Sequence, residues 1–403
     1  MPEYMAPGVY IDEMPNGIRP ISGAATAVTA FVGSAARGEK NNPVRLRSFG
    51  EYTDLFGELS KDQPMGFAVD QFFKNGGQHA LIVRVCNSGA AATGAISDAH
   101  VSDPALEAAR NGIWALEKVD RFNLLCIPPY TLDSNHDIGA QTRCAAASYC
   151  HARGAIFIAD PLQGWHEPSD IAHGVSGLDG PTWGLARNAN TAVYFPRIVI
   201  PNPLQAGGAL TIVPCGTIAG LIARTDATRG VWKAPAGLEA SMQGVTALTM
   251  TLTDRDNDML NALGVNCLRS FPPNRHVPWG ARTLVGTDHS AASEWQYLPI
   301  RRLALFLEES ISQSTQWVVL EPNGEPLWDE IRRSIEIFMQ NLFRQGAFQG
   351  KTPNEAYFVK CGPDTTTQTD IDRGIIIAHI GFAALKPAEF IIFQVRLQTA
   401  SFS

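Results

Sequence analysis

The chain has 403 residues, of which 45% are hydrophobic and 18% are charged, and its formal net charge is −7. This length and composition exclude a disordered protein and indicate a folded protein of two or three domains. The negative charge excludes an overall basic surface of the kind that binds nucleic acid, and no apolar run is long enough to cross a bilayer.

The first residues predict no export signal. Residues 1–8 lack both the basic start and the apolar core of a signal peptide, so we expect the protein to be made in the cytoplasm. The seven cysteines are scattered, odd in number and without a CxxC pair. We therefore expect buried, reduced thiols rather than disulfides or metal ligands.

The sequence of residues 1–25 predicts an N-terminal arm that extends away from the rest of the protein. A short strand at residues 9–13 carries Val9, Tyr10 and Ile11. Turn-rich segments flank it, with Pro7-Gly8 before it and Pro15, Gly17 and Pro20 after it.

Residues 26–245 predict an α/β domain. Strands are expected at residues 24–33, 80–85, 122–128, 155–159 and 192–200. Helical segments are expected at residues 48–57, 66–75, 138–153 and 215–225, and a loop at residues 173–183. Strands separated by helices in this way indicate a largely parallel sheet with helices packed against it.

The sequence of residues 246–385 predicts an α+β domain, which begins with residues 247–252 (ALTMTL). Its main element is a helix from residue 326 to about residue 345, since apolar residues recur at helical spacing and Gly346 follows as a stop. Short strands are expected before and after this helix, at residues 317–320 and 356–359. In residues 386–403, Ile391, Phe393, Val395 and Leu397 alternate with mostly polar residues, which predicts a half-apolar terminal strand.

The motifs of common enzymes are absent. Residues 346–352 resemble a phosphate-binding loop, but the two glycines are one residue too close and Pro353 blocks a following helix. No GxGxxG or GxSxG motif occurs. His166 and His173, with Glu167 and Asp170, are better explained as a solvated loop than as a metal site. The alternating charges of residues 224–233 favour a salt-bridge network. We therefore expect no enzyme activity, cofactor or metal.

The chain resembles the sheath proteins of contractile phage tails and of phage-tail-like injection systems over almost its whole length. The segments that carry the resemblance occur in the family's order and spacing. They are residues 6–11 (APGVYI), 27–33 (AVTAFVG), 72–77 (FFKNGG), 223–226 with 229–235 (ARTD, RGVWKAP), 260–261 with 264–266, 279–284 (WGARTL), 317–323 (WVVLEPN), 327–332 (LWDEIR), 370–374 (DIDRG) and 386–391 (KPAEFI). Residues 271–276 depart from the family, which more often has a glycine-rich turn there.

The resemblance implies a structural protein that stacks as rings around an inner tube. It implies that the N-terminal arm and the C-terminal strand are exchangeable and add to sheets of neighbouring copies, the mode called β-augmentation. The α/β domain would face outward and the α+β domain inward. Expected partners are further copies of the chain, an inner tube protein, and baseplate and tail-terminator proteins, with no nucleic acid and no membrane insertion. Assembly would take place in the bacterial cytoplasm, as part of a tail or of a released particle.

Contraction would then be a rotation of subunits about hinges that flank the exchanged strands. The hinge candidates are Pro15, Gly17, Pro20, Lys386 and Pro387. The tube-facing candidates lie on the polar side of the long helix and are Asp329, Glu330, Arg333 and Glu336; simple solvation explains these four equally well.

Two alternatives remain. One is an α/β enzyme with an unrecognised site. The other is a baseplate or terminator component that shares the sheath fold.

Overall fold

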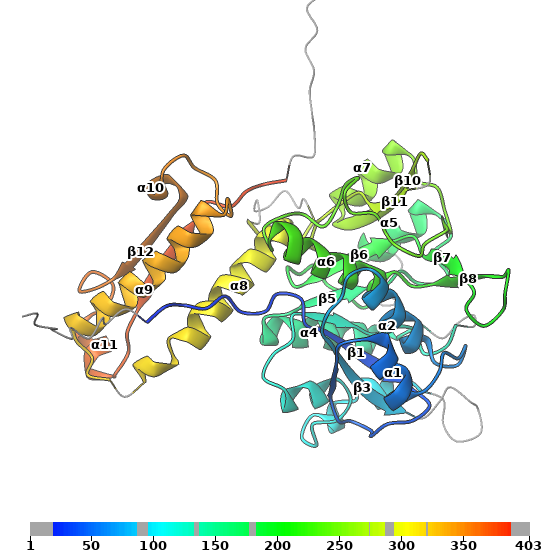
Figure 1. The fold of residues 1–403 in the computed structure, drawn as a ribbon, viewed down its shortest axis with the longest axis horizontal. Helices are drawn as coiled ribbons and strands as arrows, with labels where there is room; N and C mark the ends of the chain where they lie inside the picture. Colours follow the sequence, from blue (N-terminus) through cyan, green and yellow to red (C-terminus); the bar gives the residue numbers. More distant parts are fainter. Residues whose placement is uncertain are drawn as a thin grey trace, which may run out of the picture. The chain divides into compact units, whose positions relative to one another are not determined.

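The computed structural model describes residues 19–86, 96–132, 137–176, 183–273, 275–286, 294–319 and 321–387. These residues form two compact units, shown in Figure 1. The sheet unit contains Ala25–Phe306 and residues 385–387, and the C-terminal unit contains residues 19–24 with Leu307–Ala384. Within the described ranges, no helix combines the length and the hydrophobicity that a membrane span requires.

The sheet unit contains most of the regular structure. Its strands are β1 (Thr29–Ser34), β2 (Val44–Leu46), β3 (Ala80–Cys86), β4 (Leu124–Cys126), β5 (Ile156–Ala159), β6 (Thr191–Phe195), β7 (Ile198–Pro201), β8 (Ala209–Ile212), β9 (Ala247–Leu248), β10 (Val265–Phe271) and β11 (Arg275–Pro278). Its helices are α1 (Phe49–Phe56), α2 (Pro64–Lys74), α3 (Asp98–Val101), α4 (Ala140–Arg153), α5 (Pro168–Ser176), α6 (Cys215–Arg229), α7 (Asp254–Ala262) and the first part of α8 (Leu298–Ser314), with short 3₁₀ turns η1 (Pro104–Leu106), η2 (Gly112–Lys118) and η4 (Glu294–Gln296).

An eight-stranded sheet forms the centre of this unit, in the order β11-β10-β6-β5-β4-β1-β3-β2. The six inner strands pair in parallel. Each edge strand, β2 or β11, pairs antiparallel with its neighbour. The parallel sheet expected from alternating strands and helices is therefore confirmed. A second, three-stranded sheet has the order β8-β7-β9.

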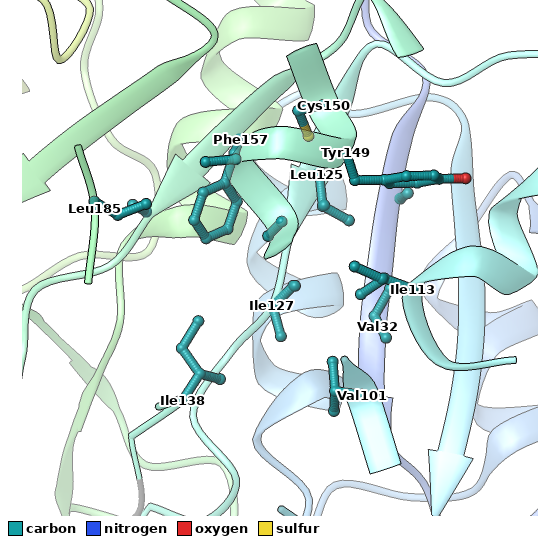
Figure 2. Packing of buried hydrophobic residues seen from close by; sticks show 14 of the residues in the cluster. Val32, Val101, Ile113, Leu125, Ile127, Ile138, Tyr149, Cys150, Phe157 and Leu185 are labelled. Carbon is teal, nitrogen blue, oxygen red and sulfur yellow. The ribbon is translucent and has the colours of Figure 1, made fainter. Parts of the chain in front are cut away.

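Both faces of the large sheet are buried. Alternate residues of one strand enter different hydrophobic clusters: Val32 packs in one and Phe31 in the other. Leu125 and Cys126 divide in the same way. Figure 2 shows the first cluster, where Ile113, Tyr149 and other side chains from surrounding elements pack against the strands. This burial on both sides explains the nearly continuous apolar runs in the strand sequences.

On the other face of the sheet, two helices approach each other closely because α6 carries glycine at successive contact positions. A Cβ atom added to Gly216 would lie 2.0 Å from the carbonyl oxygen of Ala68, and one added to Gly220 would lie 2.3 Å from that of Phe72. No larger side chain fits at either position without moving α2. The predicted helices at residues 66–75 and 215–225 therefore form a pair with backbone-to-backbone contact.

A buried ion pair connects α6 with α8. The Arg302 guanidinium donates to both carboxylate oxygens of Asp226, at 2.8 and 2.5 Å, and to the carbonyl oxygen of Thr26 at 2.9 Å. Only 3% and 6% of the two charged side chains is exposed. The charges of residues 224–233 thus include an internal salt bridge, as their alternating signs predict.

The sheet unit differs from expectation in three places. The single strand expected at residues 192–200 is wrong: it divides into β6 and β7, in different sheets, since Pro196 between them has no N–H to donate. The loop expected at residues 173–183 begins instead as the end of α5, and residues 177–182 lie outside the described residues. The expected division after residue 245 falls within the sheet unit, because β10 pairs with β6; the division between the units falls between Phe306 and Leu307.

The C-terminal unit contains the rest of α8, η5 (Gln316–Val318), α9 (Glu325–Arg344), α10 (Pro353–Ala356), β12 (Tyr357–Cys361), α11 (Gln368–Asp372) and β13 (Ala378–Phe382). The long helix is confirmed within one residue at each end. The strand expected at residues 317–320 is wrong, since Gln316–Val318 is a 3₁₀ turn and Leu320 is outside the described residues. A run of four apolar residues is too short for its periodicity to distinguish a strand from a helical turn.

Candidate inter-subunit surface

The two strands of the C-terminal unit form a small antiparallel sheet beside α9, as Figure 1 shows. Tyr357, Val359 and Cys361 share one face of this sheet. On that face the Tyr357 hydroxyl donates a hydrogen bond to Gln340 Oε1 of α9 at 2.8 Å, and Cys361 is buried. Burial raises the pKa of both the Tyr357 phenol and the Cys361 thiol. This face is therefore packed, and the helix covers it.

In the described part of the chain this sheet has only β12 and β13, and no further strand pairs with their outer edges. Just after β13, an isolated bridge pairs Ala384 with Phe348. A two-stranded sheet is marginally stable by itself, and each open edge presents unpaired backbone N–H and C=O groups. Both edges can therefore accept a further strand.

The other face of the sheet is exposed and carries an aromatic side chain. Phe358 is 52% exposed. Its cross-strand partner is Gly381, and a Cβ atom added there would lie 2.2 Å from the Phe358 ring. Lys360 and His379, the next pair along, are also exposed. The ring thus lies over Gly381 and leaves an apolar surface uncovered beside both open edges.

Arg332 organises the charges on the first half of α9. Its Nη2 atom donates to Asp329 Oδ1 at 2.6 Å, and its Nε atom lies 3.9 Å from Glu336 Oε1. Its Nη1 atom donates to the carbonyl oxygen of Cys361 at 3.3 Å, which ties the end of β12 to the helix. Asp329 and Glu336, two of the tube-facing candidates, therefore have an internal partner.

Glu330, the third candidate, is paired with the segment that precedes the sheet unit. The Arg19 Nε atom lies 3.7 Å from Glu330 Oε1, and the Arg19 guanidinium lies 4.2 Å from the centre of the Trp317 ring. The fourth candidate, Arg333, is exposed. It begins an exposed stripe of α9 that continues, at helical spacing, through Ile337, Asn341 and Arg344.

Most of the predicted inter-subunit residues lie outside the described residues. They are Val9, Tyr10, Ile11, Pro15, Gly17, Ile391, Phe393, Val395 and Leu397. The other hinge candidates are described: Pro20 and Lys386 are exposed, Pro387 is half-buried, and all three lie outside helices and strands. The described part of the chain therefore begins and ends in segments that are neither helix nor strand.

Sequence reasoning missed Arg19 and Trp317. Their contact joins opposite ends of the chain, and no local pattern in the sequence reports it. The sequence analysis also assigned Trp317 to a strand, whereas it lies in the 3₁₀ turn η5.

The carboxyl edge of the large sheet carries buried titratable groups. Cys126 Sγ lies 3.6 Å from the carbonyl oxygen of Cys215, and burial raises the pKa of both thiols. Since the thiolate is the nucleophilic form, neither thiol is activated. All seven cysteines lie in described residues, and none of them forms a disulfide; six are buried, as expected, but Cys144 is exposed. In the described ranges, no group of three or more His, Cys, Asp or Glu residues has a geometry that holds a metal ion.

Comparisons with known proteins give a consistent result. A family model for the phage tail sheath C-terminal domain matches residues 290–398. The tail sheath protein of Vibrio phage KVP40 is 28% identical over 179 residues, which are 44% of this chain but only 25% of that protein. A putative prophage major tail sheath protein of Pseudomonas aeruginosa is 24% identical over 406 residues, or 97% of this chain and 96% of that protein.

Solved structures match over almost the whole chain. A chain in the cryo-EM structure of the anti-feeding prophage baseplate is 30% identical, with a TM-score of 0.73, and the match covers 98% of this chain and 100% of that one. A chain in the helical sheath of the anti-feeding prophage, in its contracted state, is 29% identical with a TM-score of 0.75, and the match covers 98% and 99%.

Proposed function

The chain belongs to the family of contractile tail sheath proteins, and on this basis we propose that it is the sheath subunit of a contractile tail or injection particle. The observation that carries the proposal is the full-length match to chains of the anti-feeding prophage, one of which comes from its contracted helical sheath. Copies of the chain polymerise as stacked rings around an inner tube. Contraction of the cylinder drives the tube into a target cell.

Copies join by β-augmentation at the sheet of β12 and β13. The support is that this sheet has two open edges and an uncovered Phe358, whereas its opposite face is packed against α9. The strands that fill the edges are residues 9–11 and 391–397 of neighbouring copies. Main-chain hydrogen bonds supply the affinity, and alternating side chains such as Ile391 and Phe393 set the register.

Contraction is a rigid-body rotation of subunits, with the exchanged strands remaining paired. The hinges are the segments that flank those strands, residues 15–20 and residues 386–387. Support comes from Lys386 and Pro387, which lie outside regular structure. Rotation about such segments changes few hydrogen bonds.

The inner tube contacts the polar side of α9. Of the four candidates, Asp329, Glu330 and Glu336 each lie next to an arginine of the same subunit, and Arg333 is exposed. We therefore place the contact on the exposed part of the helix, near Arg333. Subunits assemble in the cytoplasm of a bacterium, without nucleic acid or membrane insertion.

The family assignment favours a structural protein over the alternative of an α/β enzyme. The protonated, buried thiols at the carboxyl edge of the sheet are consistent with that view. A second candidate function is a baseplate-associated copy of the sheath fold, which the match to the anti-feeding prophage baseplate structure favours.

Electron microscopy of the purified full-length chain tests the proposal. We expect hollow, striated tubes from the intact chain. A variant that lacks residues 1–20 should keep its helical circular dichroism and cooperative unfolding but form no tubes. Discs or single subunits from the intact chain would favour the baseplate-associated function, and normal tubes from the deletion variant would refute the role of the N-terminal arm.

A further inference from the structure

Residues 19–24 lie against α8 and α9 as a fixed segment of the C-terminal unit. The backbone N–H of Ala24 donates to Ser310 Oγ at 2.9 Å, and that of Ser22 donates to Ser314 Oγ at 3.2 Å. Ser310 and Ser314 are one helical turn apart on α8, so the segment follows the helix in the antiparallel direction. It meets Trp317 and Glu330 through Arg19.

Arg19 makes two contacts at the N-terminal end of this segment, one with Trp317 and one with Glu330. Its guanidinium combines a cation–π contact with Trp317 and an ion pair with Glu330, so one side chain makes two favourable contacts. Beyond Arg19, Ser314 and Ser310 each accept a single hydrogen bond from a backbone N–H group of the segment. If the segment is pulled from its N-terminal end, these two hydrogen bonds break one after the other. Among the described residues, the contacts of Arg19 are therefore the first that such a pull breaks.

We propose that Arg19 is the anchor of the N-terminal arm: it fixes the point at which the arm leaves its own subunit to pair with a second copy of this chain. The inference rests on the proposed function and adds a positioning residue to it. It also moves the hinge. Pro20 lies on the held side of Arg19, so the movable part of the arm ends before Arg19.

The anchor limits how far the arm reaches. Ile11 precedes Arg19 by eight residues, so the strand at residues 9–11 pairs within about 28 Å of the anchor, even in a fully extended chain. Release of residues 19–24 adds about 17 Å to that limit. An intact anchor therefore keeps neighbouring copies at a defined spacing and transmits tension to α8 and α9.

Hydrogen exchange on the full-length chain before assembly tests the anchor directly. In Arg19→Ala, the amides of Ser22 and Ala24 should exchange about fivefold faster than in the unchanged protein, and Arg19→Lys should restore part of the protection because it keeps the charge. Arg45→Ala is the matched control, since it removes an exposed arginine from β2 in the sheet unit. Equal exchange in Arg19→Ala and Arg45→Ala would overturn the anchor.

Assembled tubes test whether the anchor carries tension. Tubes of Arg19→Ala should dissociate in urea about fivefold faster than tubes of Arg45→Ala. Faster exchange without faster dissociation would overturn the role in tension. If the unchanged protein forms no tubes, the proposed function fails, while the exchange result still decides whether Arg19 holds the segment.

Discussion

Asp160 should make the sheet unit less stable as pH rises, and Asp160→Asn should remove that dependence. The residue follows β5, and its Oδ1 atom accepts a hydrogen bond from the backbone N–H of Cys215 at 3.0 Å. Its Oδ2 atom is buried and has no hydrogen-bond partner in the described part of the chain. Burial raises the pKa of this carboxyl from 3.8 to about 7, although Cys215 and Arg197 act in the opposite direction.

The sign and size of the effect follow from this raised pKa. The folded protein keeps the proton up to about pH 7, whereas the unfolded chain releases it near pH 4. Stability contributed by the protonated carboxyl is therefore complete at low pH, decreases as pH rises from about 4 to about 7, and is level above that. A shift of about three units corresponds to at most about 4 kcal/mol, since each unit is worth about 1.4 kcal/mol.

Urea unfolding at several pH values measures this effect through tryptophan fluorescence. The unfolding free energy of Asp160→Asn, relative to the unchanged protein, should rise by about 2–4 kcal/mol between pH 4.5 and pH 8. The control is Asp54→Asn, which neutralises an exposed carboxylate on α1. If the difference between Asp160→Asn and the unchanged protein is the same at both pH values, Asp160 is ionised in the folded protein and the reasoning is refuted.

Three further substitutions probe other parts of the molecule. Gly220→Ala should lower the unfolding free energy by about 1–3 kcal/mol, because the added methyl group meets the backbone of α2; thermal unfolding with no change in midpoint would contradict this. Arg302→Ala should cost about 3–5 kcal/mol in urea unfolding, since it leaves Asp226 buried without its partner, and adding Asp226→Ala should recover part of the loss. Arg333→Glu should weaken co-sedimentation of tubes with the inner tube protein and leave the unfolding free energy within about 0.5 kcal/mol; unchanged co-sedimentation would move the contact elsewhere.

The elements that sequence predicted correctly are those whose own residues determine them. The helix α9 has apolar residues at every turn along one face and a glycine after its last turn, so its bounds are visible locally. Likewise, the start of α1 can be recognised locally, because Ser48 is a typical capping residue and its Oγ accepts a hydrogen bond from the backbone N–H of Glu51. The parallel order of the inner strands follows from their alternation with helices.

The errors have a different origin. Whether β7 continues β6 or joins another sheet depends on the partners available after Pro196, which are the next strand, β8, and the more distant β9. In the same way, Arg332 binds the carbonyl oxygen of Cys361, a choice that its charged neighbours on α9 do not reveal. Local patterns identify a charged face on a helix, but only the folded chain shows which of those charges are already paired.

The large sheet of the sheet unit and the small sheet of the C-terminal unit differ in how much of their edges is left unpaired, and this contrast supports assembly through the C-terminal unit. In the eight-stranded sheet the edge strands β2 and β11 have only three and four residues, and each pairs antiparallel with the strand beside it, so little free edge remains. In the C-terminal unit β12 and β13 have five residues each, and in the described part of the chain both outer edges are unpaired. A core with both faces covered has no need of a second copy, whereas a two-stranded sheet packed on one helix gains stability from each strand added to it. Under the proposed function, we expect the sheet unit to remain one rigid body during contraction, with added strands holding neighbouring copies together at the sheet of β12 and β13.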